Sequence, residues 1–360
     1  MELREYMTKS FKEIQYGHQY EVCKAHPEWF GNDECFGTFR GKQYKFILKD
    51  SMNNLYERLR TRDKNDLLNV LRYFRENGIG WWSGAKPSGH MCSSQISCVN
   101  HLFPLRYDRT AVLALANSVA REAGEQPFDD VLEIGGDKSM PGYIAFEVIT
   151  SRDYLNEAKD GKLSRGSQCT SVDAAILAVR RDKVHILPIE WKFVEEYNRE
   201  DKSKNFFDRK ENKWVCSGDE RIRRYFKSGL VPDSKQIKLD DWLEVPGSVF
   251  FQEPYYQLMR QTLWAEQVVA NNDEFFKGAA DYIHVHAVPE ANTTLRDRHY
   301  RNVSWDKGDG MVATWKPNLR NPEKYVCIDQ KKLFQGILDD KDLSSKYADL
   351  LTYLEERYWK

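Results

Sequence analysis

The chain has 360 residues, an apolar fraction of 41% and a formal net charge of −1. This composition supports a globular core and excludes general disorder, while the near-zero charge gives no direct sign of a nucleic-acid partner. No run approaches the ~18 apolar residues of a transmembrane helix, and the charged amino terminus lacks a signal-peptide pattern. We therefore expect a cytoplasmic protein with no membrane partner.

The seven cysteines are scattered along the chain and include no C-x-x-C pair. This spacing argues against a zinc ribbon and against a thioredoxin-type site. We expect reduced thiols, several of them buried.

The first hundred residues predict short elements and a loop. Residues 36–50 have the pattern of two short strands around Gly41, and leucines at helical spacing predict a helix or helix pair over 53–77. Glycine, proline and serine crowd the following segment, which predicts an ordered loop. Ser93 or Ser94 then caps a helix that reaches about residue 102.

The middle of the chain alternates helices and strands. The clearest helix spans 108–123, capped by Asp108 or Thr110 and ended by Gly124. A polar turn at 180–183 between two apolar runs predicts a β-hairpin. The remaining expected elements are strands at 129–135, 143–150, 171–180, 184–193 and 281–288, and helices at 219–228, 253–271 and 343–358.

This order predicts an α/β fold, with a central mixed β-sheet flanked by helices. We expect an amino-terminal extension over 1–105 that packs on a catalytic core at 106–290, followed by a helical carboxy-terminal tail at 291–360.

Three ionisable residues fall together in the predicted hairpin. Glu190 and Lys192 share a strand face because side chains at i and i+2 project the same way. Asp173 begins the antiparallel partner strand, so its carboxylate is expected beside them. Two buried carboxylates are costly unless they are neutralised, and Mg²⁺ or Mn²⁺ with oxygen ligands does this well. Such an ion can activate water and polarise a phosphoryl oxygen, which is the chemistry of phosphodiester hydrolysis.

The same residues resemble a known signature. Asp173 with Glu190-Trp191-Lys192 is similar to the Asp…Glu-x-Lys motif of the PD-(D/E)XK superfamily, and the wider text resembles its restriction-endonuclease-like branch. The stretches that carry this wider likeness are Trp81-Trp82, His90–Leu105, Phe146-Glu147, Arg165–Ala174, Ile189–Glu195 and Tyr255–Gln261.

The resemblance implies a restriction-endonuclease-like core, with Asp173 and Glu190 as metal ligands and Lys192 as the catalytic lysine. Val172 stands where the superfamily name has proline, a frequent replacement. Glu147 is expected as a third ligand, holding the same metal or a second one; the alternative is a solvent-facing strand carboxylate. Glu195 either pairs with Lys192 or lies outside the site.

Other polar clusters carry weaker hypotheses. Gln257 and Arg260 can reach a phosphate, although hydrogen bonds within the core are the preferred interpretation. His284 and His286 share a strand face, but no third metal ligand is near. Basic and aromatic residues interleave at 221–227 and 296–301, where they can contact a nucleic-acid backbone.

The sequence therefore predicts a Mg²⁺-dependent endonuclease that hydrolyses DNA in restriction, defence or repair. The expected substrate is double-stranded DNA, and a homodimer would supply one active site for each strand. One alternative is a nucleic-acid-binding protein with this fold but no turnover. A second is an unrelated protein with a chance E-W-K, whose Asp173 and Glu190 carboxylates would lie well beyond ~8 Å apart.

Overall fold

The computed structural model describes residues 9–63, 65–82, 84–134, 141–158, 162–163, 165, 169–197, 201–240, 243–300 and 303–360. Its strands are β1 (Gly37–Phe39), β2 (Lys42–Tyr44), β3 (Asp130–Leu132), β4 (Ile144–Val148), β5 (Val172–Arg180), β6 (Lys183–Trp191), β7 (Phe206–Asp208), β8 (Lys213–Val215), β9 (Asp281–Tyr282), β10 (His284–Ala287) and β11 (Tyr325–Ile328). Its α-helices are α1 (Phe11–Ala25), α2 (Val70–Glu76), α3 (Ser94–Leu102), α4 (Arg109–Glu122), α5 (Ser217–Ile222), α6 (Tyr255–Ala270), α7 (Thr293–Arg296), α8 (Met311–Trp315), α9 (Gln330–Leu333), α10 (Gln335–Asp339), α11 (Lys341–Lys346) and α12 (Ala348–Tyr358).

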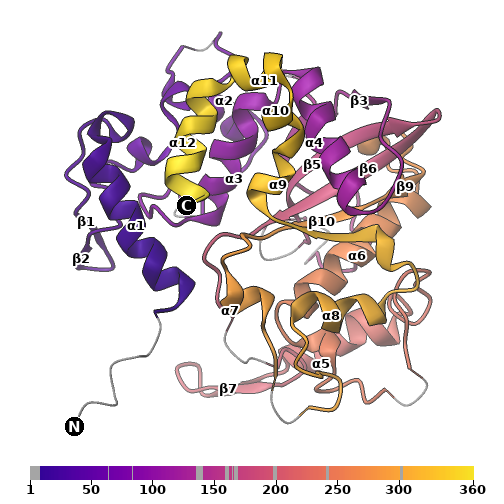
Figure 1. The fold of residues 1–360 in the computed structure, drawn as a ribbon. Helices are drawn as coiled ribbons and strands as arrows, with labels where there is room; N and C mark the ends of the chain where they lie inside the picture. Colours follow the sequence, from indigo (N-terminus) through magenta and orange to yellow (C-terminus); the bar gives the residue numbers. More distant parts are fainter. Residues whose placement is uncertain are drawn as a thin grey trace.

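A mixed sheet of seven strands forms the centre of the molecule, which confirms the predicted fold class (Figure 1). Its main order is β11-β10-β6-β5-β3; β4 also pairs with β5, and β9 with β6. β5 and β6 are the predicted antiparallel hairpin, whereas β10 runs parallel to both β6 and β11. The carboxyl end of β6 therefore lies between an antiparallel and a parallel neighbour.

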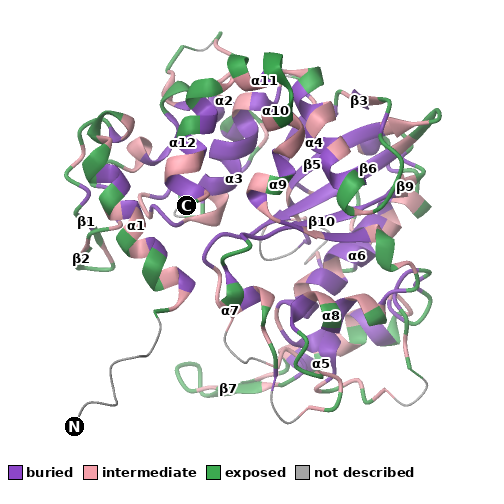
Figure 2. Cartoon of the chain, viewed as in Figure 1, coloured by how far each residue is buried: buried purple, intermediate pink, exposed green. Residues whose placement is uncertain are grey.

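Helices cover both faces of this sheet (Figure 1). α3 and α4 pack on one face with the carboxy-terminal helices, and their apolar residues join one continuous core cluster with the sheet. α6 and α8 contribute to a second cluster on the other face. Figure 2 shows the strands of the central sheet largely buried between the two layers, whereas the β7–β8 hairpin is exposed. None of the described helices has the length and apolar run needed to cross a bilayer.

Local sequence signals account for the best-predicted helices. Ser93 caps α3 by accepting a hydrogen bond from the backbone N–H of Ile96, at 3.4 Å. Asp108 caps α4 by accepting from the N–H groups of Thr110 and Ala111. Gly124 follows α4 at φ +70°, a conformation that a residue without Cβ adopts readily.

The predicted helix over 53–77 is wrong for most of its length. Only Val70–Glu76 is α-helical, and two short 3₁₀ turns occupy Ser51–Asn54 and Glu57–Arg60. The side chains of Asp63 and Asp66 accept hydrogen bonds from backbone N–H groups two residues ahead. Such local bonds compete with helix formation, which overrides the leucine spacing.

The expectation that all seven cysteines are reduced is also wrong. Cys23, near the end of α1, is joined by a disulfide to Cys35, with their Cα atoms 6.4 Å apart. A turn of the chain brings this pair together, and sequence spacing does not reveal it. The other five are free thiols, and Cys92, Cys98 and Cys169 are buried as predicted.

Both ends of the described chain meet in one bundle, where α1 lies against α12 (Figure 1). Gln19 of α1 donates to the backbone oxygen of Arg357, at 2.6 Å. β11, which falls within the predicted helical tail, pairs with β10 in the central sheet. The predicted three-part division of the chain stays a prediction, although this strand ties the tail to the sheet.

Candidate active site

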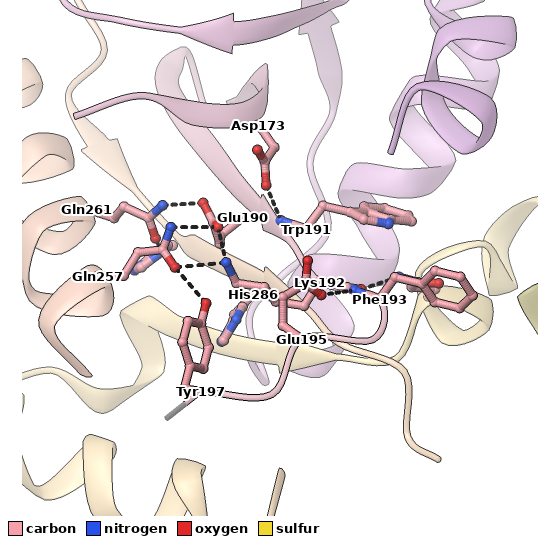
Figure 3. Close-up of polar contacts among 12 residues, drawn as sticks. Asp173, Glu190, Trp191, Lys192, Phe193, Glu195, Tyr197, Gln257, Gln261 and His286 are labelled. Carbon is pink, nitrogen blue, oxygen red and sulfur yellow. Dashed lines mark hydrogen bonds and ion pairs between the residues drawn. The ribbon is translucent and has the colours of Figure 1, made fainter. Parts of the chain in front are cut away.

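The hairpin register places the predicted trio at one end of the sheet. Ala174 of β5 pairs with Ile189 of β6, so Asp173 and Glu190 are the next residues of their strands at this end. The Asp173 carboxylate accepts a hydrogen bond from the backbone N–H of Trp191, at 2.7 Å (Figure 3). Lys192 directly follows β6, and its own N–H donates to the carbonyl oxygen of Ala287 in β10, at 2.8 Å. Pairing with strands on both sides thus fixes the backbone that carries the trio.

Glu190 and Lys192 form a buried ion pair. Their side chains are 5% and 7% exposed, and Lys192 Nζ lies 2.5 Å from Glu190 Oε1. Burial lowers the pKa of Lys192, but Glu190 and the other nearby acidic groups together outweigh that effect, so the net pKa is well above the ordinary lysine value. Lys192 is therefore a charged ammonium at neutral pH. Removing both charges from water costs several kcal/mol per ion. Apolar residues of similar volume would often be as stable, so stability alone does not explain this ion pair.

Two glutamines of α6 complete this cluster, and Figure 3 shows both pointing at Glu190. Gln257 donates to Glu190 Oε1 at 2.8 Å, and its own oxygen accepts from Lys192 at 2.8 Å and from the Tyr197 hydroxyl at 3.1 Å. Gln261 donates to Glu190 Oε2 and accepts from His284 of β10. Gln257 is a candidate from the sequence, whereas no sequence pattern gives Gln261 a role.

Glu147 approaches the site from β4 through an irregular backbone. On either side of it Phe146 pairs with Ala174 and Val148 with Val172, but Glu147 has a left-handed φ of +48°. Residues other than glycine adopt this conformation at a cost of about 1–3 kcal/mol, and such strain concentrates at functional sites. Its carboxylate accepts from Gln95 Nε2 of α3, at 2.7 Å. Glu147 is therefore not a solvent-facing strand carboxylate.

The three carboxylates influence one another. Burial raises the pKa of Asp173 well above its usual range, and the charges of Glu190 and Glu147 raise it further. Burial also raises the pKa of Glu147; the hydrogen bond from Gln95 lowers it, and Glu190 raises it. Asp173 and Glu147 together line a narrow hollow beside α3, whose other walls are Phe74, Gln95, Cys98, Val99 and Phe146. Burial and the neighbouring carboxylates thus both disfavour the charged forms of Asp173 and Glu147.

The trio is nevertheless not gathered around one point. Asp173 turns toward the Trp191 backbone, whereas Glu190 turns toward α6 (Figure 3). Across the described ranges, no group of three or more His, Cys, Asp or Glu side chains is arranged to hold a metal ion. Metal ligation by Asp173, Glu190 and Glu147 therefore stays a prediction.

The remaining candidates have structural partners. Glu195 accepts from the backbone N–H of Phe193, and its charge raises the pKa of Lys192. Arg260 forms an ion pair with buried Glu157, at 2.8 Å. His284 and His286 are buried in β10, and burial lowers the pKa of each, so both rings are neutral.

The two basic and aromatic segments also make contacts within the protein. Arg223 and Arg224 both pair with Glu220, at 2.8 and 3.2 Å. Arg296 donates to the backbone oxygens of Val288 and Pro289. Arg301, at the end of the second segment, lies outside the described residues.

Comparison with known proteins gives one match that covers most of the chain. The model of a family described as "Restriction Endonuclease associating with ARP" matches residues 24–359. No curated protein and no solved structure matches the chain. A match over this length includes the whole candidate site, and the chain belongs to this family of restriction endonucleases.

Proposed function

We propose that this protein is a divalent-metal-dependent endonuclease of the PD-(D/E)XK type that hydrolyses DNA. The observation that carries the proposal is the buried Glu190–Lys192 pair at the end of the hairpin, with Asp173 on the neighbouring strand. The family membership supports nuclease activity in general, and the residues at this site supply a specific chemistry for it.

The oxygen donors of these residues are of the kind that a hard cation prefers, although the carboxylates are not gathered around one point in this structure. Asp173 and Glu190 would hold it through carboxylate oxygens, and Glu147 would hold the same ion or a second one. Burial is the main cause of the raised pKa values of Asp173 and Glu147, and repulsion between the carboxylates adds to it. A bound cation would offset both effects. When bound, Mg²⁺ or Mn²⁺ would lower the pKa of a water molecule and polarise a phosphoryl oxygen.

Lys192 has the properties required for the remaining step. Its ammonium is charged and fixed by Glu190 and Gln257, so it needs little reorganisation to act. We propose that Lys192 orients the attacking water and stabilises the negative charge that develops on the phosphate. Gln257 and Gln261 hold the Glu190 carboxylate in one orientation, which makes them positioning residues.

The decisive comparison uses supercoiled plasmid with and without Mg²⁺. We expect nicking or linearisation by the wild type only when metal is present, and none by Lys192→Ala. Lys183→Ala is the matched control, because Lys183 is an exposed lysine at the opposite end of the same strand. Thermal unfolding measures whether Lys192→Ala is still folded. If the variant loses its fold along with its activity, the result contradicts a catalytic role for Lys192.

Double-stranded DNA is the substrate that we propose, with a homodimer providing two active sites. Linear product that appears without accumulation of nicked circles, from a species that sediments as a dimer, would support this. Successive nicking by a monomer would contradict the dimer but leave the nuclease chemistry intact.

One observation favours a binding protein without turnover. Both Glu190 oxygens already accept hydrogen bonds from amides of α6, as an inert polar core would require. Such a protein would bind DNA but cut nothing across a panel of plasmid, genomic and single-stranded substrates with Mg²⁺ or Mn²⁺. Metal-dependent cleavage of any of them excludes this alternative.

A further inference from the structure

Trp82 is the most exposed of the large apolar side chains described, at 74% of its surface. Its neighbour Trp81 is buried and stacks on Phe74 of α2, with ring centroids 3.9 Å apart and planes within 8°. The backbones of Trp81 and Gly84 also form an isolated antiparallel β-bridge. Trp81 and Gly84 are thus anchored, while the indole of Trp82 remains in solvent.

A single side chain connects this tryptophan to the candidate site. Gln95 Oε1 accepts from the backbone N–H of Trp82, at 2.9 Å, while Gln95 Nε2 donates to the Glu147 carboxylate, at 2.7 Å. The same Nε2 donates to the Gly80 carbonyl oxygen, at 3.2 Å. One amide therefore fixes the Trp82 backbone relative to a carboxylate of the site.

Arg165 makes a second connection between the loop and the site. Its guanidinium donates from Nε to the backbone oxygen of Glu147, at 2.8 Å, and from Nη1 to the Gly78 oxygen, at 3.1 Å. The loop that carries Trp82 is consequently held at both Gly78 and Trp82. A scattered surface aromatic needs no such support.

We infer that Trp82 is a substrate-positioning residue that stacks on a nucleobase beside the scissile phosphate. The inference rests on the proposed nuclease function and adds a feature of its substrate. A base within a continuous duplex has both faces covered, so Trp82 requires a base that is unpaired or turned out of the stack. An exposed indole on an anchored backbone offers a flat surface for any such base. The preferred substrate is then DNA with a local interruption of base stacking.

Direct binding tests this contact without turnover. The parent is full-length Lys192→Ala with Ca²⁺, and the probes are a labelled 30-mer duplex with one unpaired base and its fully paired counterpart. We expect Trp82→Ala in this background to raise Kd for the interrupted duplex about tenfold, in keeping with the loss of one base–aromatic contact. The paired duplex should bind nearly as it does to the parent. Trp82→Phe should recover most of the affinity, whereas Trp82→Leu should not.

Trp214→Ala is the matched control. Trp214 is 67% exposed, but it lies on the β7–β8 hairpin, and no described contact joins it to Glu147 or Gln95. It should leave Kd unchanged. An equal loss in Trp214→Ala would overturn the inference, and so would recovery by leucine, which would indicate an apolar protein contact. Unchanged thermal unfolding of Trp82→Ala is expected for so exposed a residue.

The two proposals fail in different ways. If the wild type cleaves DNA with metal but Trp82→Ala binds like its parent, stacking is overturned and the nuclease stands. If the wild type cleaves nothing but binding depends on the Trp82 ring, the nuclease is overturned and the base contact stands.

Discussion

At the scale of single residues, Asp173 is the clearest test of metal binding. Replacing Asp173 by Asn keeps the shape and the acceptor for the Trp191 N–H but removes the negative charge. We expect Mg²⁺ affinity to fall by at least about tenfold, since even indirect changes around metal ligands cost that much. Isothermal titration would measure it. Asp182→Asn, in the hairpin turn at φ +64°, is the control, because asparagine accepts that conformation. Unchanged affinity in Asp173→Asn would exclude Asp173 as a ligand.

How far individual residues can be predicted depends on how local their partners are. Asp173, Glu190 and Lys192 follow from strand alternation and hairpin pairing, which sequence spacing encodes. Gln95 and Gln261 cannot be predicted in this way. Each is a helix residue whose partner is distant in the sequence, and no local pattern indicates such a partner. The resemblance and the strand position both indicate Glu147, but no sequence signal predicts its left-handed φ.

At the scale of elements, α12 depends on one buried side chain. The Arg357 guanidinium is fully buried and donates to Asn54, to Gln19 and to the Tyr353 hydroxyl. Arg357→Ala removes the donor to the side-chain oxygens of Gln19 and Asn54, at a cost of about 1–3 kcal/mol for each. The Asn54 carbonyl oxygen and the Tyr353 hydroxyl keep a hydrogen bond from Asn100. We expect a clear fall in the free energy of unfolding, measured by urea denaturation, and faster proteolysis of α1.

The control for this prediction is on the same helix. Glu356→Gln removes the charge of a surface pair with Lys360, and exposed pairs contribute little. If Arg357→Ala has the same free energy of unfolding as Glu356→Gln, α12 docks through its apolar face alone.

Elements were predicted best where they carry their own signals. α4 has a capping aspartate, an alanine-rich interior and a terminal glycine, and the structure has it within a residue of the expected bounds. β11 is only four residues long and follows a region without clear periodicity, so nothing in the sequence distinguished it from a loop. Its place beside β10 comes from the parallel pairing of a distant segment, which local patterns do not encode.

At the scale of the whole molecule, buried histidines make stability depend on pH. Burial lowers the pKa of both His101 and His284 from 6.5 to about 3. His101 Nε2 accepts from the Trp359 indole, so protonation would set one N–H against another. Below pH 6.5 the unfolded chain binds a proton at each site and the folded chain does not. Stability is therefore complete above that pH and falls on acidification, by about 2 kcal/mol per histidine between pH 8 and pH 5.

The raised pKa values of Asp173 and Glu147 act in the opposite direction, since these carboxylates take up protons more readily in the folded state. The pH dependence of wild-type stability therefore gives only the sum of the histidine and carboxylate contributions. His284→Asn isolates one histidine, because asparagine is neutral at both pH values and can still bond to Gln261 and Thr262. We expect the loss of unfolding free energy from pH 8 to pH 5 to be about 2 kcal/mol smaller in the variant. Urea denaturation at the two pH values measures this difference, and equal losses in variant and wild type would mean that His284 is protonated inside the fold.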